Sequence, residues 1–248
     1  MEGPVLLTGS EGRVGRAILA GLGEDYDWRL LDREPPRGDH PGEFVVADIT
    51  DEAEMRAAVE GVGAVVHLAG DPRREAPWNS VLHNNIDGTY LTMLAAAEAG
   101  VEKVVFASSN HAVGAYETDE RTPDIYRPDD EFRLTGEEPY RPGNVYGVSK
   151  ATGEILGRYF HDEYGLSVVC VRIGNLTKDH PPENYERGQA MWLSHRDCAH
   201  LFDRCLRATY GYEIVYGISD NDRKYYSIDR AREVLGYRPE DNSADHVD

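Results

Sequence analysis

Short apolar runs with the length of β-strands alternate with helix-length segments through about residue 175 of the chain. Because these runs are apolar throughout, they predict strands that helices cover on both faces. Repeated strand, helix and strand predict an α/β fold, a doubly wound parallel sheet. The predicted strands span residues 5–7, 29–31, 44–47, 65–68, 104–107 and 168–173, and the predicted helices span residues 14–22, 52–59, 81–99 and 151–164.

The rest of the chain is shorter and less regular. Beyond residue 175 the pattern predicts a helix at 196–208, a strand at 213–216 and a final helix at 229–235. This part is too small to fold well alone, so we expect a domain of residues 1–175 and a small substrate-binding lobe of residues 176–248 packed on its sheet. Residues 115–144, rich in Pro, Arg, Asp and Glu, predict an irregular loop on the substrate side.

The charge of the chain excludes several classes of partner. The 248 residues include 45 acidic and 26 basic side chains, for a net charge of −19, which repels phosphate backbones and anionic lipid. No apolar run approaches the roughly 18 residues of a membrane span, and the N-terminus lacks a signal-peptide pattern. Three cysteines without a C-x-x-C pair favour neither a disulfide framework nor a metal site. We expect a soluble, cytoplasmic protein that binds neither nucleic acid nor membrane.

Lysine is scarce among the basic residues. Lys103, Lys150, Lys178 and Lys224 are the only lysines, and the other basic residues are arginine. Excess acid with little lysine predicts a surface adapted to concentrated salt, where screening removes the self-repulsion of such a charge. The alternative is an ordinarily acidic cytosolic protein.

Glycines follow the first predicted strand at regular spacing. In T-G-S-E-G-R-V-G, residues 8–15, glycines permit a tight turn, close approach of the backbone to a pyrophosphate, and close packing of the next helix. The N–H groups that open that helix then face the anion. The pattern predicts a dinucleotide-binding Rossmann domain, with cofactor contacts at Gly9, Gly12, Arg13, Val14 and Gly15.

An acid ends the second predicted strand. Asp32 lies about where a ribose-binding carboxylate belongs, and it would repel a 2′-phosphate, so it favours NAD over NADP. Arg33 and Arg13 leave the alternative open, because either side chain could pair with a 2′-phosphate.

Y-G-V-S-K places Tyr146 and Lys150 four residues apart at the start of a helix, and so on one face. The field of Lys150 could favour the phenolate of Tyr146, which is a poor base at its ordinary pKa. Ser108 and Ser109 end the fifth strand, at the sheet edge where this fold binds ligands. Asn85 is expected to position a water or a backbone group behind the lysine. The alternative role of Asn85 is helix capping. The alternative for Tyr146 and Lys150 is that they form an ordinary contact on the protein surface.

The motifs T-G-x-x-G-x-x-G, H-L-A-G, N-N-I-D-G-T, S-S-N-H and Y-G-x-S-K, in this order, resemble those of the extended short-chain dehydrogenases/reductases. Within that family, S-S-N-H-A-V-G-A-Y and R-I-G-N resemble the uronate dehydrogenases. The phrases H-L-A-G-D-P-R, E-R-G-Q-A-M-W and Y-G-I-S-D-N-D-R-K-Y-Y are similar to the haloarchaeal NAD-dependent glucose-6-phosphate dehydrogenases, over nearly the whole chain.

The resemblance implies roles for individual residues. It makes Tyr146 the general base, Lys150 its electrostatic and ribose-binding partner, and Ser109 the donor to the reacting oxygen. It places Asp48 and Ile49 at the adenine, Leu68, Ala69 and Gly70 along the cofactor, Ile173 and Asn175 near the nicotinamide, Asn110 and His111 at the substrate, and Arg187 where uronate dehydrogenases hold the substrate carboxylate.

The chain departs from the uronate dehydrogenases at two informative places. After the fourth strand it has Asp71-Pro72-Arg73-Arg74 where those enzymes have a serine, and its loop at residues 115–144 is longer. Because arginine offers a planar charged fork to phosphate or carboxylate, Arg73, Arg74 and Arg187 are candidates for the anionic end of the substrate. The alternative for each is a surface salt bridge.

The resemblance implies an NAD-dependent oxidation of glucose 6-phosphate at C1, giving 6-phosphogluconolactone and NADH in the oxidative pentose phosphate pathway. Three alternatives stay open: a uronate dehydrogenase, a nucleotide-sugar epimerase and a non-catalytic dinucleotide sensor. The family's dimer interface corresponds to the helices at 81–99 and 151–164, so we expect a homodimer.

Overall fold

A computed structural model describes residues 2–118, 124–127, 129–177, 180–183 and 186–246. In this part of the chain seven parallel strands form the central sheet, in the order β3-β2-β1-β4-β5-β6-β9. They are β1 (Val5–Thr8), β2 (Trp28–Asp32), β3 (Glu43–Val46), β4 (Ala64–His67), β5 (Lys103–Ser109), β6 (Ser167–Ile173) and β9 (Tyr212–Gly217). The prediction of a doubly wound parallel sheet is confirmed.

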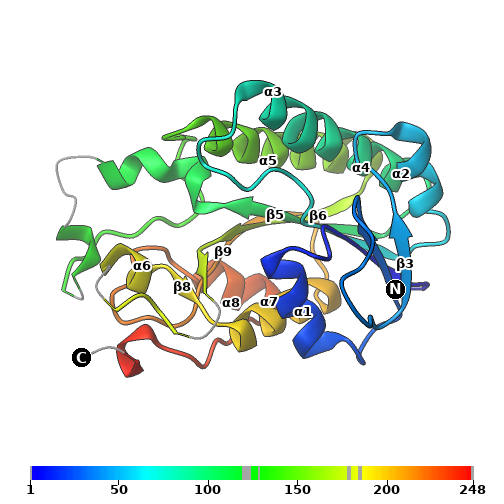
Figure 1. The fold of residues 1–248 in the computed structure, drawn as a ribbon. Helices are drawn as coiled ribbons and strands as arrows, with labels where there is room; N and C mark the ends of the chain where they lie inside the picture. Colours follow the sequence, from blue (N-terminus) through cyan, green and yellow to red (C-terminus); the bar gives the residue numbers. More distant parts are fainter. Residues whose placement is uncertain (1, 119–123, 128, 178–179, 184–185, 247–248) are drawn as a thin grey trace.

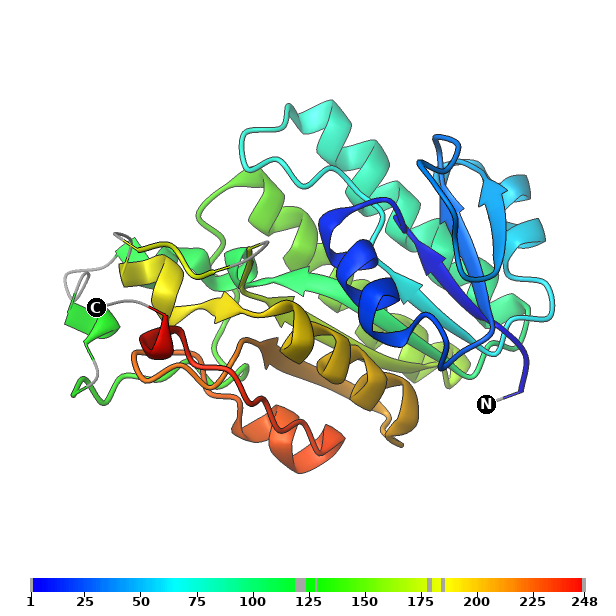
Figure 2. The same ribbon diagram turned by 60° about the horizontal axis from the view of Figure 1, so that its bottom comes forward.

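Helices cover both faces of the sheet (Figure 1). On one face lie α1 (Arg13–Leu22), α7 (His195–Arg207) and α8 (Asp229–Leu235), and on the other lie α2 (Glu52–Ala58), α4 (Gly88–Glu98) and α5 (Val145–Tyr164), with α3 (Trp78–Val81) beside them. Figure 2 brings the first face forward, with α7 and α8 lying across it. Every residue of β1, β4 and β5 is buried, as expected for strands between two helical layers. Of the described residues, none forms a helix long and apolar enough to cross a membrane.

The helix predicted at residues 81–99 is interrupted. A π-helical turn, Leu82–Asp87, separates α3 from α4. A π-turn inserts one extra residue and so rotates the side chains that follow. Here it buries the side chain of Asn85 between the loop after β4 and helix α5. Hydrophobic periodicity does not reveal such a turn, because its neighbours keep the helical pattern.

The chain beyond residue 175 is joined to the sheet. It contributes β9, which pairs with β6, and α7, which packs against α1. It also forms β7 (Asn175–Leu176), α6 (Glu186–Ala190) and β8 (Trp192–Leu193), of which β7 and β8 pair with each other. The division at residue 175 therefore stays a prediction about function, because one hydrophobic core contains residues from both sides of it.

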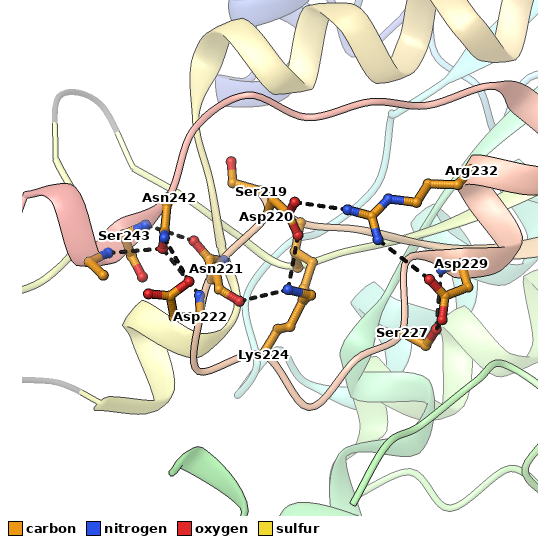
Figure 3. A network of polar contacts seen from close by, with 12 residues as sticks. Ser219, Asp220, Asn221, Asp222, Lys224, Ser227, Asp229, Arg232, Asn242 and Ser243 are labelled. Carbon is orange, nitrogen blue, oxygen red and sulfur yellow. Dashed lines mark hydrogen bonds and ion pairs between the residues drawn. The ribbon is translucent and has the colours of Figure 1, made fainter. Parts of the chain in front are cut away.

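The loop after β9 is fixed by a polar network (Figure 3). The Oδ1 atom of Asn221 accepts from the backbone N–H of Ser243 at 2.9 Å, and Asp220 forms ion pairs with Lys224 at 2.9 Å and with Arg232 at 2.8 Å. These contacts hold the loop to α8 and to the C-terminal segment. The loop leads directly into two buried tyrosines that reach the candidate site.

Residues 115–144 are irregular where described. They carry the end of a 3₁₀ segment, Asn110–Thr118, and a second short one, Asp124–Tyr126. Leu134 bridges to Tyr226, and the apolar side chains of the segment pack on the tyrosines of the loop after β9.

Candidate active site

A cavity of about 1200 Å³ opens at the carboxyl ends of the strands. The order of strands reverses between β1 and β4, and a doubly wound fold binds ligands at that point. The turn after β1, the ends of β2, β4, β5 and β6, the start of α5, and α6 supply its walls. The structure brings every predicted site residue to this cavity except Asn85.

The glycine turn has no room for side chains. A Cβ atom on Gly9, whose φ is 70°, would lie 2.8 Å from the backbone nitrogen of Ala69. A Cβ on Gly15 would lie 2.6 Å from the carbonyl oxygen of Ser10. Gly12 is the N-cap of α1 and brings no side-chain hydrogen bond, so the first N–H groups of α1 stay available to an anion. This cradle fits the pyrophosphate of a dinucleotide.

Two acids, Asp32 and Asp48, line the cavity at the ends of neighbouring strands. At the end of β2, Asp32 accepts from the backbone N–H of Glu11 at 3.1 Å and from that of Arg33 at 2.9 Å. Asp48 accepts from the backbone N–H of Thr50 at 2.9 Å. Both carboxylates line the cavity with their positions fixed by the backbone.

Asn85 lies behind the cavity wall. Its Oδ1 atom accepts from the backbone N–H of Asp71 at 2.6 Å, and its Nδ2 atom donates to the carbonyl oxygen of Asp71 at 3.0 Å and to the hydroxyl of Ser149 at 3.1 Å. The side chain therefore connects the loop after β4 to α5, one residue before Lys150. Asn85 thus positions a backbone group, that of Asp71.

Asn144 fixes the start of α5, and with it the position of the phenol. The Asn144 side chain caps the helix by accepting from the backbone N–H of Gly147 at 2.8 Å. Tyr146 lies in the first turn, and Lys150 follows one turn later on the same face. The ammonium of Lys150 lies 5.6 Å from the centre of the Tyr146 ring. Ser109, the last residue of β5, lies beside the phenol, and its side chain favours the phenolate.

Burial dominates the pKa values of this group. It raises the pKa of Tyr146 to about 12, although the neighbouring Ser109 side chain acts in the opposite direction. Burial also lowers the pKa of Lys150 to about 8, against the charge of Glu154. In the chain without ligands, desolvation is therefore the largest influence on the pKa of Tyr146, and the effect of the Lys150 charge on the phenolate stays a prediction.

A buried ion pair that no sequence motif predicted lies behind the lysine. The guanidinium of Arg172, on β6, donates two hydrogen bonds of 2.9 Å to the Glu154 carboxylate, which also accepts from the Ser108 hydroxyl at 2.5 Å. Glu154 lies one turn beyond Lys150. Its spacing of four residues from the lysine is the sequence signal that could have identified it.

His111 forms the wall next to the phenol. Its ring lies 5.7 Å from the Tyr146 ring, centre to centre, and its Nδ1 atom lies 3.1 Å from the amide nitrogen of Asn144. Burial, with the positive charges of Arg187 and Arg74, lowers the pKa of His111 to about 4. The imidazole is therefore neutral at physiological pH and can hydrogen-bond a sugar hydroxyl.

A buried carboxylate, that of Glu117, connects Arg187 in α6 with Tyr226 in the loop after β9. It is 4% exposed and accepts hydrogen bonds from Arg187 and from the hydroxyl of Tyr226. Asn110 donates to the Tyr226 hydroxyl at 3.2 Å and accepts from Ser109 at 3.2 Å. No motif in the sequence points to Glu117, whose partners are 70 and 109 residues away in the chain. No described residue of 115–144 lines the cavity, and this segment reaches the site residues through Glu117 and through Asn144.

Arg73 lines the cavity but is already paired. Its guanidinium donates to the two carboxylate oxygens of Asp71 at 2.9 and 2.6 Å, and Ser80 donates to the same group at 2.6 Å. These hydrogen bonds, those from Arg73 first, hold the pKa of Asp71 below its usual range.

The model of the NAD dependent epimerase/dehydratase family matches residues 5–196. The chain belongs to this family. It is 68% identical over 251 residues to an NAD-dependent glucose-6-phosphate dehydrogenase of Haloferax volcanii, covering 99% of this chain and 96% of the relative. It is 36% identical to a uronate dehydrogenase of Pseudomonas putida, covering 96% and 84%. The predicted resemblance to the uronate dehydrogenases and to the glucose-6-phosphate dehydrogenase group is confirmed.

Solved structures agree with the family assignment. A uronate dehydrogenase from Agrobacterium tumefaciens in complex with NAD superposes with a TM-score of 0.85 and 34% identity, covering 98% of this chain and 86% of that one. The family assignment agrees with the position of the cavity, which lies where the order of parallel strands reverses.

Proposed function

We propose that the chain is an NAD-dependent dehydrogenase that oxidises C1 of glucose 6-phosphate to 6-phosphogluconolactone. The observation that carries the proposal is the 68% identity to the Haloferax volcanii enzyme across nearly the whole of both chains. The placement of Ser109, Tyr146 and Lys150 around one cavity supports it, because a non-catalytic sensor requires none of the three.

The cavity suits NAD. The glycine cradle would hold the pyrophosphate, and Asp32 would accept hydrogen bonds from the ribose hydroxyls while repelling a 2′-phosphate. Arg33 and Arg13 also line this part of the cavity, but the guanidinium of Arg13 donates to the carbonyl oxygen of Leu176 at 3.0 Å. When bound, the oxidised nicotinamide supplies the hydride acceptor and a positive charge beside the phenol.

Residues of the chain accept the proton that leaves the C1 hydroxyl. Tyr146, as phenolate, accepts the proton of the C1 hydroxyl, while Ser109 donates a hydrogen bond to the same oxygen. The C1–H bond breaks with its electron pair as the carbonyl of the lactone forms. Lys150 is protonated at neutral pH, because its pKa is about 8, and its charge favours the phenolate. His111 and Asn110 would hold the sugar hydroxyls, and Arg187 and Arg73 are proposed for the anionic end.

Oxidation of a uronate is the second candidate. Relatives named uronate dehydrogenase are 34–37% identical to this chain, and Arg187 can hold a carboxylate as well as a phosphate. Initial rates with NAD and NADP in molar KCl, for glucose 6-phosphate, glucuronate, galacturonate and glucose, separate the two. We expect the highest kcat/KM for NAD with glucose 6-phosphate. A higher value for either uronate would overturn the proposal.

We propose a homodimer formed through α4 and α5. On this outer face, Tyr90, Ile155, Tyr159 and Tyr164 are exposed large apolar side chains, with Ile155 at 54%. A second copy would cover them, and contiguous apolar patches of this kind mark interfaces. Ile155→Glu should convert a dimer to a monomer in light scattering. A monomeric wild type would contradict the proposal.

A cytoplasmic location is proposed too, since the three cysteines are free and buried.

A further inference from the structure

Three arginines at the substrate end of the cavity differ in their partners. The guanidinium of Arg187 is paired with the buried carboxylate of Glu117, and that of Arg73 with Asp71. Arg74 lines the same cavity, is exposed, and forms an ion pair with none of the described carboxylates. Of these three cations, Arg74 alone carries a charge that no described acid compensates.

Arg74 and Arg187 line the same cavity from different elements of the fold. Arg74 lies in the loop after β4 and Arg187 in α6, and the positive charge of each lowers the pKa of His111. The His111 ring lies next to the ring of Tyr146, 5.7 Å away between centres. A sugar that placed C1 at the phenol would therefore extend past His111 toward these two guanidinium groups.

The charges distinguish two kinds of anionic substrate. Arg187 with Glu117 is a pair of zero net charge, which can donate hydrogen bonds to a singly charged carboxylate. A phosphate monoester has its second pKa near 6 and so carries close to two negative charges at neutral pH. Binding the second charge in a chain of net charge −19 requires a cation that is not already neutralised.

We propose that Arg74 is the residue that makes this site prefer a sugar phosphate to a uronate, by binding the phosphate directly. The inference rests on the proposed function and adds the residue that determines its specificity. Arg187 serves both kinds of anion, whereas Arg74 serves the phosphate.

The test compares Arg74→Gln with the wild type on three substrates: glucose 6-phosphate, glucuronate and unphosphorylated glucose. We expect kcat/KM for glucose 6-phosphate to fall about 10- to 100-fold, mainly through KM, since a hydrogen bond to a charged group is lost. The values for glucuronate and glucose should stay within about twofold. Arg230→Gln, at an exposed arginine of α8 paired with Glu213, removes the same charge far from the cavity and should change none of them.

The outcomes separate this inference from the proposed function. If wild type prefers glucose 6-phosphate and Arg74→Gln keeps the full preference, the role of Arg74 is overturned while the function stands. A loss of equal size on all three substrates also overturns it. If wild type itself does not prefer glucose 6-phosphate, the proposed function fails.

Discussion

The ammonium of Lys150 donates a hydrogen bond to the carbonyl oxygen of Ala107 at 2.8 Å. This contact connects the first turns of α5 to the end of β5, two residues before Ser109. Since Ser109 lies beside the phenol of Tyr146, strand and helix fix the donor, the base and the cation relative to one another. The catalytic group is therefore positioned by the fold before any ligand binds.

Tyr146→Phe should lower kcat about 10²- to 10⁴-fold, because it removes the group that accepts the proton and leaves the cavity shape intact. The affinity for NADH, measured by fluorescence titration, should change little. Tyr26→Phe is the matched control: that hydroxyl bonds Asp203 outside the cavity, so the variant should keep wild-type kcat. Near-normal turnover in Tyr146→Phe would refute the assignment of the base.

The strands and the cofactor turn were predictable from local sequence. Six predicted strands lie within one or two residues of β1 to β6, since buried strands are apolar runs bounded by turns. Asp32 and the glycines are recognisable because spacing within one strand–turn–helix unit determines their geometry.

The rest depended on contacts between distant residues. Glu117 lies in a segment that reads only as an irregular loop, and it acquires its place through Arg187 and Tyr226. Asn85 faces the protein interior because of the π-turn, and the spacing of hydrophobic residues does not predict that turn. β7 and β8 have two residues each, too few for a pattern.

Asp32→Ser should lower the ratio of kcat/KM for NAD over NADP about 10- to 100-fold, because the ribose loses a charged acceptor and the repulsion of a 2′-phosphate disappears. Steady-state rates with both cofactors at fixed glucose 6-phosphate measure the ratio. Asp25→Ser, an exposed acid in the turn before β2, controls for the loss of one negative charge. An unchanged ratio would show that Asp32 does not discriminate between the cofactors.

Glu117→Gln should raise KM for glucose 6-phosphate more than it lowers kcat, since Arg187 loses the partner that orients it. We also expect a loss of about 1–3 kcal/mol in the free energy of unfolding, because a largely buried guanidinium is left without its counter-charge. Rates and denaturant unfolding measure the two effects. Glu60→Gln, at an exposed acid, should leave both unchanged. If KM does not move, Glu117 has no positioning role.

Concentrated salt should stabilise the protein. At a net charge of −19 the folded chain repels itself in dilute buffer, and molar KCl shortens the range of that repulsion to a few ångströms. The midpoint of thermal unfolding and the activity should both rise between about 0.1 M and 2 M KCl. Full activity and an unchanged midpoint in dilute buffer would instead indicate an ordinarily acidic protein.

His67 should make stability depend on pH. Its ring is buried between the hydroxyls of Thr8 and Thr89, and burial, aided by the charge of Lys150, lowers its pKa to about 3. In the unfolded chain the ordinary pKa is near 6.5, so between these values only the unfolded state binds the proton. Stability therefore falls as the pH drops below about 6.5, by up to about 1.4 kcal/mol per pH unit from this group.

The variant His67→Gln tests this contribution, because glutamine can keep hydrogen bonds to the threonines and does not titrate. Its absolute stability at pH 7 is expected to be lower than that of wild type, since the smaller side chain no longer stacks on Phe106. Its slope of unfolding free energy against pH, between about pH 6 and 4.5, should be smaller by close to one proton. Parallel slopes for the two proteins would mean that His67 is protonated in the folded state.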